Sequence, residues 1–155
     1  MSSTSFSSTN KPRAIVTFVL AYVTVTILAI ALSLSISAIT HSPQTAKPLE
    51  NSAYLLSERF LPPLNLFVWM ATSWMYFRMR PQISASRREA TVLGCLWLIM
   101  ALVVDYVGFV LIKNPISLSP HDFYIGQFPW IYLIYLAILV SPMCYVALLN
   151  ARQAK

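Results

Sequence analysis

Four long apolar runs divide this chain, and they constrain its fold more than any other feature. They cover roughly residues 14–38, 60–77, 91–112 and 129–149. About 20 helical residues cross a hydrocarbon core of about 30 Å, so each run is long enough to span a membrane. A soluble domain of 155 residues has no use for four such stretches. The sequence therefore predicts an all-α integral membrane protein.

Composition and loop length refine this prediction. Hydrophobic residues make up 57% of the chain and charged residues 10%, whereas soluble proteins carry about 25% charged residues. The connections between the runs are short, which favours an antiparallel four-transmembrane-helix bundle over residues 14–149. The Ser- and Thr-rich beginning predicts a disordered cytoplasmic tail over residues 1–13, and residues 150–155 are expected to form a second short cytoplasmic tail.

The basic residues are sorted between the runs. The net charge is +6, and eight of the eleven Lys and Arg lie before the first run, between the second and third, or after the fourth. The segments 39–59 and 113–128 together carry three basic and three acidic residues. By the positive-inside rule, both termini and the 78–90 loop are expected in the cytoplasm. This pattern indicates a plasma (inner) membrane protein whose basic face meets anionic lipid headgroups rather than nucleic acid.

The segment 51–60 is predicted to be a short amphipathic helix at the outer interface. Asn51 or Ser52 is a suitable N-cap, and the apolar residues that follow cluster on one side of the helix. Pro62 and Pro63 suit the first turn of the next helix, because an N–H group missing there costs little.

Asp105 is the one charged residue inside a predicted span. A carboxylate there costs about 2.5–3.5 kcal/mol on insertion scales, so it is expected to face the interior of the bundle. It lies about 10 Å inside the outer end of its helix, by the rise per residue. The polar residues at similar depth on the other helices are Ser33, Asn65, Tyr132 and Tyr135. Together they predict a polar layer in the outer half, which is either a binding pocket or a structural hydrogen-bond clamp.

The outer loops add further candidate binding residues, namely Glu58, Arg59, His121 and Asp122. The long side chain of Arg59 is predicted to reach inward toward Asp105. The adjacent His121 and Asp122 are expected either to cap the segment before the last run or to act as an acid–base pair.

No motif indicates a metal, a cofactor or a catalytic centre. The chain has no Cys/His cluster at metal-ligand spacing, no P-loop, no His-Glu-x-x-His and no Gly-x-Ser-x-Gly. We therefore assign no catalytic residue, no metal and no cofactor from the sequence.

One enzyme class shares general features with this chain. Its size, its four runs, and the stretch Asp122-Phe123-Tyr124-Ile125-Gly126 before the last run resemble the lipoprotein signal peptidases, which are membrane aspartyl proteases. That chemistry requires two carboxylates sharing a proton. The third run lacks the family's Gly-Asn and Asp-Arg pairs, because Tyr106 follows Asp105, and no Asn or Asp occurs between Tyr132 and Val140. The activity is therefore not carried over to this chain.

These features together predict a small, non-catalytic membrane subunit that binds a partner, a lipid or a small ligand. Besides the lipid bilayer, another membrane protein or a second copy of the chain is the expected partner. A first alternative is a small transporter or channel-like oligomer that uses Asp105 as a proton or cation site. A second alternative is a membrane enzyme acting on lipid or an exported peptide at the outer face.

Overall fold

The computed structural model describes residues 10–42, 48–79, 86–113 and 117–153, and this part of the chain is helical without any strand. The elements follow in the order α1 (Lys11–Thr40), η1 (Pro48–Glu50), α2 (Ser52–Glu58), α3 (Leu61–Arg78), α4 (Arg87–Asp105), η2 (Tyr106–Leu111), η3 (Asp122–Gly126) and α5 (Trp130–Gln153). The first short element is a 3₁₀-helix, and η2 and η3 are π-helices. The all-α prediction is therefore confirmed.

Three helices are long and apolar enough to cross a membrane: α1, α4 continued by η2, and α5. They correspond to three of the four predicted runs. The remaining run forms α3, which is not among the three because it carries Asn65, Thr72, Ser73 and a terminal Arg78. Length and composition thus support three candidate spans among the described residues, and the four-transmembrane-helix bundle stays a prediction.

The predicted boundaries hold to within a few residues, and so does the capping of α2. Asn51 is the N-cap, with its side-chain oxygen accepting hydrogen bonds from the backbone N–H groups of Ala53 and Tyr54. Proline occupies the start of α3, as predicted. Residues 1–9 of the predicted tail lie outside the described residues, and α1 already begins at Lys11 behind the N-cap Asn10.

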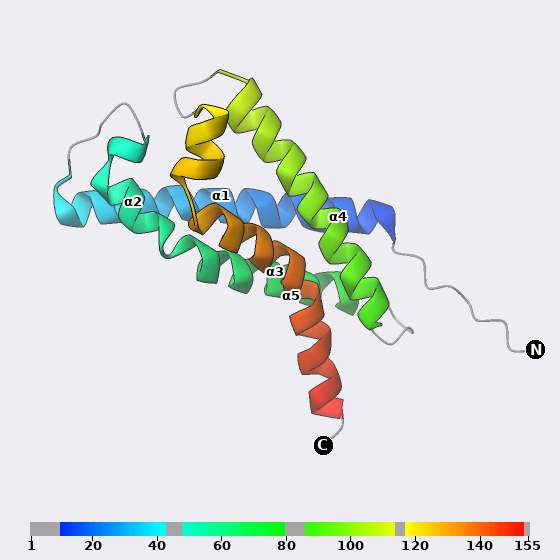
Figure 1. Cartoon of the computed structure of the whole chain (residues 1–155). Coiled ribbons are helices and arrows are strands. Elements are labelled where there is room, and N and C mark those ends of the chain that lie inside the picture. Colours follow the sequence, from blue (N-terminus) through cyan, green and yellow to red (C-terminus); the bar gives the residue numbers. More distant parts are fainter. Residues whose placement is uncertain (1–9, 43–47, 80–85, 114–116, 154–155) are drawn as a thin grey trace, which may run out of the picture.

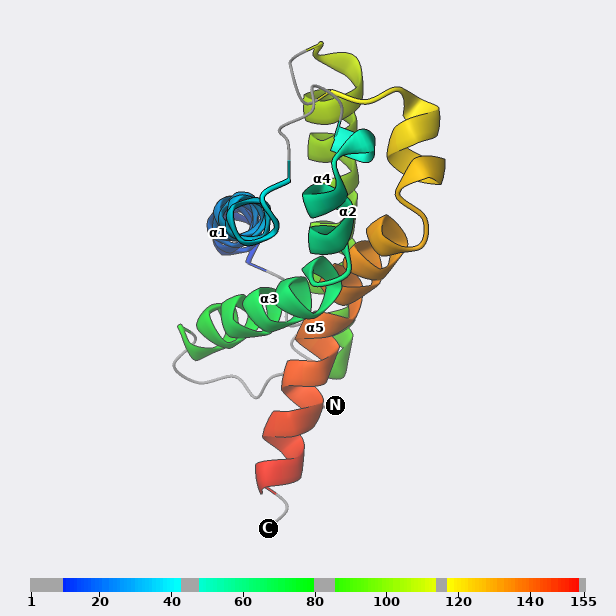
Figure 2. The same ribbon diagram turned by 90° about the vertical axis from the view of Figure 1, so that its left-hand side faces the viewer.

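The long helices cross obliquely instead of forming a parallel-sided bundle. In Figure 1, α1 runs across the view and α3 returns the other way, whereas α4 and α5 run diagonally. In Figure 2, α1 is seen end-on, whereas α4 and α5 run down the picture. The helix α3 packs against both α1 and α5, and α5 packs against α4. The core is consequently formed around the pair α3 and α5.

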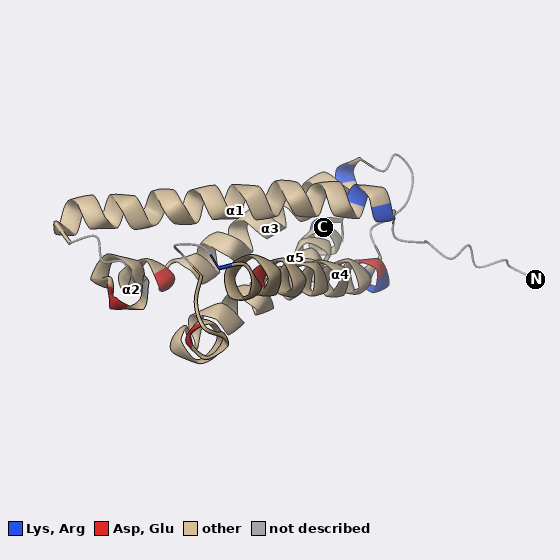
Figure 3. Cartoon of the chain, turned by 90° about the horizontal axis from the view of Figure 1, so that it is seen from above, with Lys and Arg blue, Asp and Glu red and all other residues tan. Residues whose placement is uncertain are grey.

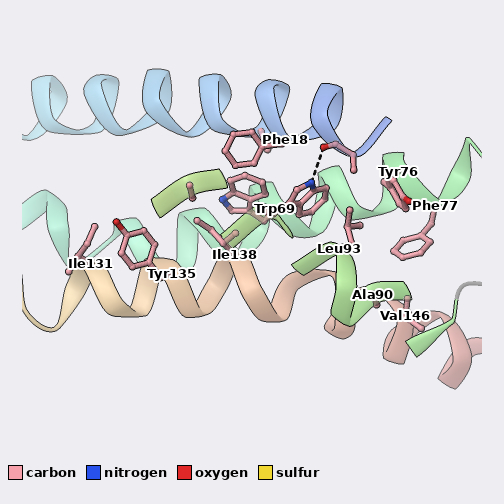
Figure 4. Packing of buried hydrophobic residues seen from close by; sticks show 14 of the residues in the cluster. Phe18, Trp69, Tyr76, Phe77, Ala90, Leu93, Ile131, Tyr135, Ile138 and Val146 are labelled. Atoms are coloured by element: carbon pink, nitrogen blue, oxygen red, sulfur yellow. Dashed lines mark hydrogen bonds between the residues drawn. The ribbon is translucent and has the colours of Figure 1, made fainter. Parts of the chain in front are cut away.

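Aromatic rings fill the core where α1, α3 and α4 meet (Figure 4). The ring centroids of Phe18 and Trp69 are 5.6 Å apart, and those of Trp69 and Trp97 are 5.2 Å apart. The indole N–H of Trp97 donates to the backbone carbonyl of Ala14 over 3.0 Å. This buried donor is therefore satisfied, and it ties α4 to the first turn of α1.

A glycine brings α4 and α5 together. A Cβ atom added to Gly94 would lie 2.3 Å from the backbone carbonyl oxygen of Leu139. Only glycine permits so close an approach of the two backbones, as small residues commonly do between membrane helices.

The basic residues of three helix ends gather at one end of the molecule (Figure 3). They are Lys11 and Arg13 at the start of α1, Arg78 at the end of α3, and Arg87 and Arg88 at the start of α4. Among them Glu89 is only 3% exposed. Its carboxylate accepts a hydrogen bond of 3.0 Å from the hydroxyl of Tyr76, which itself accepts one of 3.2 Å from the backbone N–H of Asn10. These bonds connect α1, α3 and α4 at this end.

Candidate functional site

Asp105 is the residue on which three helices converge. It ends α4, its side chain is buried, and both carboxylate oxygens accept hydrogen bonds. The hydroxyl of Tyr22 on α1 donates to one oxygen, and the hydroxyl of Tyr135 on α5 donates to the other over 2.8 Å. A carboxyl group inside an apolar bundle is thereby hydrogen-bonded, as a buried polar group requires. We refer to Asp105, Tyr22 and Tyr135 as the carboxylate cluster.

Each member of the carboxylate cluster is positioned by its own helix. Tyr22 stacks on Phe18 one turn earlier, with ring centroids 5.6 Å apart, and Phe18 is itself held in the aromatic core. Tyr135 lies on the buried face of α5, one turn from Ile131 and near Ile138 (Figure 4). The tyrosine hydroxyls are therefore directed by apolar contacts of their rings.

The backbone changes from α-helix to π-helix immediately after Asp105. The π-helix η2 begins at Tyr106, and a second π-helix, η3, packs against it through Phe109 and Phe123, whose rings are stacked 6.1 Å apart. Short π-helical segments are rare and occur frequently at functional sites. The buried carboxylate of Asp105 therefore lies directly beside such a change of backbone geometry.

Tyr124 extends the site toward the outer loop. It lies in η3, next to Phe123, and its ring meets that of Phe123 edge-on at 5.1 Å. The pKa of the Tyr124 hydroxyl is raised, first by burial and then by the negative charge of Asp105. Tyr124 is thus close enough to the carboxylate cluster to feel its charge while remaining partly exposed.

The predicted polar layer is only partly assembled. Asp105 and Tyr135 come together as their depths indicate, but Asn65 bonds within α3 instead, donating to Leu61 O at 2.9 Å and accepting from the Trp69 indole at 3.1 Å. Tyr132 is 46% exposed. These two residues do not join the carboxylate cluster.

On α1 the contributing residue is Tyr22 and not Ser33. Ser33 follows Tyr22 by eleven residues, a separation of about 16 Å along a helix. Counting residues from the outer helix ends gives equal depths only for upright helices of equal length. The helix α1 has 30 residues and crosses the others obliquely (Figure 2). Tyr22 carries the only aromatic hydroxyl in the run 14–38, and this was the signal that could have identified it.

The outer loops form a second polar cluster, made of Glu58, Tyr54 and Gln127. Glu58 is 4% exposed. Burial raises the pKa of its carboxyl from the ordinary 4.5 to about 7, against the opposing effect of a hydrogen bond with Tyr54. The Tyr54 hydroxyl accepts a hydrogen bond of 2.6 Å from Nε2 of Gln127. This cluster fastens α2 to the turn that precedes α5.

The other outer-loop candidates are exposed. Arg59 is exposed, and within the part of the chain that the structure describes no ion pair joins it to Asp105. The side chains of His121 and Asp122 are 78% and 50% exposed, with Nδ1 and Oδ1 3.7 Å apart. The expected cap comes from a different residue, because Ser119 Oγ accepts the hydrogen bond of the Asp122 N–H at 3.1 Å. The separation within the pair is longer than a hydrogen bond.

No group of three or more His, Cys, Asp or Glu suited to hold a metal ion occurs among the described residues. No protein-family model matches the chain, and comparisons with curated proteins and with solved structures give no match. Any functional assignment therefore has to come from the site itself.

Proposed function

We propose that this chain is a four-span protein of the plasma membrane with both termini in the cytoplasm. The helix α3 has 18 residues, or a length of about 27 Å, close to the thickness of the hydrocarbon core. Its polar groups are satisfied inside the helix, because Thr72 and Ser73 each donate to the carbonyl four residues earlier. The basic end in Figure 3 supports the proposed orientation.

In this membrane frame the chain acts as a non-catalytic, ligand-binding subunit, and the carboxylate cluster is its binding site. The observation that carries this proposal is the convergence of α1, α4 and α5 on Asp105 at the start of a π-helix. A lone packing clamp needs no change of backbone geometry, whereas a site that must admit a ligand benefits from one.

The ligand is expected to be a small cation. Asp105 supplies the carboxylate, Tyr22 and Tyr135 bond it through their hydroxyls, and Tyr124 is near enough for its pKa to be raised by Asp105. A carboxylate combined with aromatic rings suits an organic ammonium group, through charge and cation–π attraction. Glu58, the other buried carboxylate of the outer half, is engaged with Tyr54, so a pair of cooperating acids for hydrolysis is not supported.

Binding can be tested on the purified chain in a mild detergent. Tetramethylammonium, ethylammonium and sodium are each titrated while the midpoint of thermal unfolding is measured, because a ligand that binds only the folded state raises it. An ammonium ion is expected to raise the midpoint. The effect should disappear in Asp105→Asn and weaken in Tyr135→Phe, whereas Tyr132→Phe, at the exposed ring, keeps it. An equal effect in Asp105→Asn would contradict the proposal.

Transport of a cation or proton through Asp105 is the second candidate, and the π-helix η2 favours it because a locally adjustable backbone permits alternating exposure. Proteoliposomes containing the chain and an outward gradient of labelled ethylammonium distinguish the two candidates. Flux that requires Asp105 assigns a transporter, and binding without flux assigns a binding subunit.

A further inference from the structure

A second site lies farther along α1, in the part of this helix that is less buried against the rest of the described chain. Between Ala21 and Ser37 no residue of α1 is buried. Two attachments bound this stretch of α1: the hydrogen bond of Tyr22 with Asp105, and, just past the end of the helix, the contact between the Ser42 and Ser52 hydroxyls, which are 3.0 Å apart. The oblique crossing leaves an open groove between these two attachments.

The groove is apolar along nearly its whole surface. Its walls are formed on α1 by Leu28, Ala31, Leu32 and Ser35, and at the start of α3 by Phe60 and Leu64. From Leu28 to Ser35 is seven residues, so the groove follows α1 for about 10 Å, a third of the hydrocarbon core. A cleft of this kind inside a bilayer is open to an acyl chain.

One exposed positive charge directly precedes a residue of the groove in the sequence. Arg59 is the C-cap of α2 and immediately precedes the groove residue Phe60. It is exposed, and its backbone N–H donates to the Ser57 carbonyl, whereas its guanidinium group makes no hydrogen bond or ion pair with the other residues that the structure describes. A guanidinium group at the interface is well suited to hold a phosphate through two parallel hydrogen bonds.

The acidic residues of a second copy of the chain offer Arg59 no obvious partner. On the outer side, Glu58 is buried against Tyr54, and Asp122 lies beside His121. Glu50 is also engaged in an interaction of its own. The anion that complements Arg59 is therefore more readily supplied by the bilayer than by another copy.

We infer that this groove binds a phospholipid of the outer leaflet with an anionic headgroup, whose phosphate contacts Arg59 and whose acyl chain lies along Leu28, Leu32 and Phe60. This inference rests on the membrane orientation proposed above, but the site is separate from the carboxylate cluster and does not depend on the ligand proposed there. The acyl chain would fill the groove between α1 and the start of α3 in the outer half.

The test uses the full chain in a mild detergent, with phosphatidylglycerol, phosphatidylcholine or inorganic phosphate added. Native mass spectrometry counts bound lipids, and thermal unfolding reports stabilisation. Phosphatidylglycerol is expected to bind at lower concentration than phosphatidylcholine, and inorganic phosphate alone should have no effect. Arg59→Gln should weaken phosphatidylglycerol binding about tenfold, as the loss of one charge-assisted interaction implies.

Matched variants separate this site from general attraction to lipid. Lys113→Gln removes another exposed outer charge and should leave binding unchanged. Ala31→Trp fills the groove and should reduce binding of both lipids, while Ile30→Trp, at a neighbouring position 54% exposed, should not. Ser35→Leu is a milder substitution of the same kind if Ala31→Trp does not fold.

Two results would overturn the inference. The first is equal loss of phosphatidylglycerol binding in Arg59→Gln and Lys113→Gln, which would assign the effect to net charge. The second is a change of oligomeric mass in Ala31→Trp with lipid binding unaltered, which would assign the groove to a second copy of the chain.

Discussion

At the scale of single residues, Asp105 places a polar carboxyl group in an apolar interior and joins three helices there. A carboxylate inside an apolar bundle is costly unless its oxygens are hydrogen-bonded. Tyr22 and Tyr135 meet that requirement from two other helices, and both tyrosines are partly or wholly buried. The same bonds that stabilise the carboxylate consequently tie α1 and α5 to α4, so the fold and the candidate site share the same atoms.

Substitution of Asp105 separates these roles. Asp105→Leu leaves the hydroxyls of Tyr22 and Tyr135 without acceptors and should lower the free energy of unfolding by about 1–3 kcal/mol. Asp105→Asn retains polar atoms that can bond both hydroxyls and should cost less than about 1 kcal/mol. Chemical denaturation in detergent measures both values. Val103→Leu, at a position 57% exposed, serves as the control. Equal costs for Asn and Leu would show that the hydrogen bonds contribute little.

Glu58 predicts a dependence of stability on pH. Burial raises its pKa from 4.5 to about 7, so the folded chain holds a proton that the unfolded chain has released. The stabilisation is complete below pH 4.5 and is lost as the pH rises through about 7. The slope is at most about 1.4 kcal/mol per pH unit. Unfolding midpoints at pH 5 and pH 8 should therefore differ, with the higher midpoint at pH 5.

The variant Glu58→Gln isolates this effect. It preserves the shape of the side chain without the ionisation, so its midpoint should change less between pH 5 and pH 8 than that of the unchanged chain. Glu50→Gln, at an exposed position, should keep the full dependence. Identical pH profiles for Glu58→Gln and the unchanged chain would rule out Glu58 as the source.

At the scale of secondary-structure elements, the approach of α4 and α5 is set by one missing side chain. Gly94 lies against the backbone of Leu139, and α5 continues through Pro142 with Ser141 Oγ donating to the Ile138 carbonyl at 3.1 Å. This local hydrogen bond occupies a carbonyl in the segment where proline interrupts the ladder. Close backbone approach at Gly94 therefore contributes directly to the packing of α4 against α5.

The two helical glycines of the third run make a matched pair for testing this. Gly94→Ala places a Cβ atom 2.3 Å from the Leu139 oxygen and forces the helices apart, which should cost about 1–3 kcal/mol. A Cβ atom at Gly108 meets nothing within 4 Å, so Gly108→Ala should be neutral or stabilising by about 0.5–1 kcal/mol. Thermal unfolding of both variants decides the matter, and similar midpoints for the two would contradict the close approach.

At the scale of the whole molecule, the sequence predicted where the helices are better than how they cross. Hydrophobic length identified α1, α4 and α5 as spans, because the requirement for about 20 apolar residues is independent of neighbours. Crossing angles arise from contacts such as Phe18 with Trp69 and Gly94 with Leu139, which no single-run pattern encodes. For this reason the predicted proximity of Asp105 and Tyr135 agrees with the structure, whereas Tyr22 occupies the place on α1 that the sequence pattern predicts for Ser33.

The proposed orientation is tested by labelling single cysteines in intact cells, after Cys95 and Cys144 have been replaced. A membrane-impermeant reagent should label His121→Cys and leave Met79→Cys unlabelled until the cells are opened. Both positions are exposed at the ends of their helices. Labelling of Met79→Cys from outside would reverse the orientation or remove α3 from the set of spans.

The length of α1 has a mechanical consequence. Its 30 residues amount to about 45 Å, against a hydrocarbon core of about 30 Å, so in the proposed membrane arrangement the excess length is expected to be accommodated by tilting or bending of the helix or by local thickening of the bilayer. Because Tyr22 lies on this helix and bonds Asp105, a thinner or thicker membrane is then expected to shift one donor of the buried carboxylate relative to the other. Membrane thickness is therefore expected to influence the hydrogen bonds of Asp105 through the position of α1.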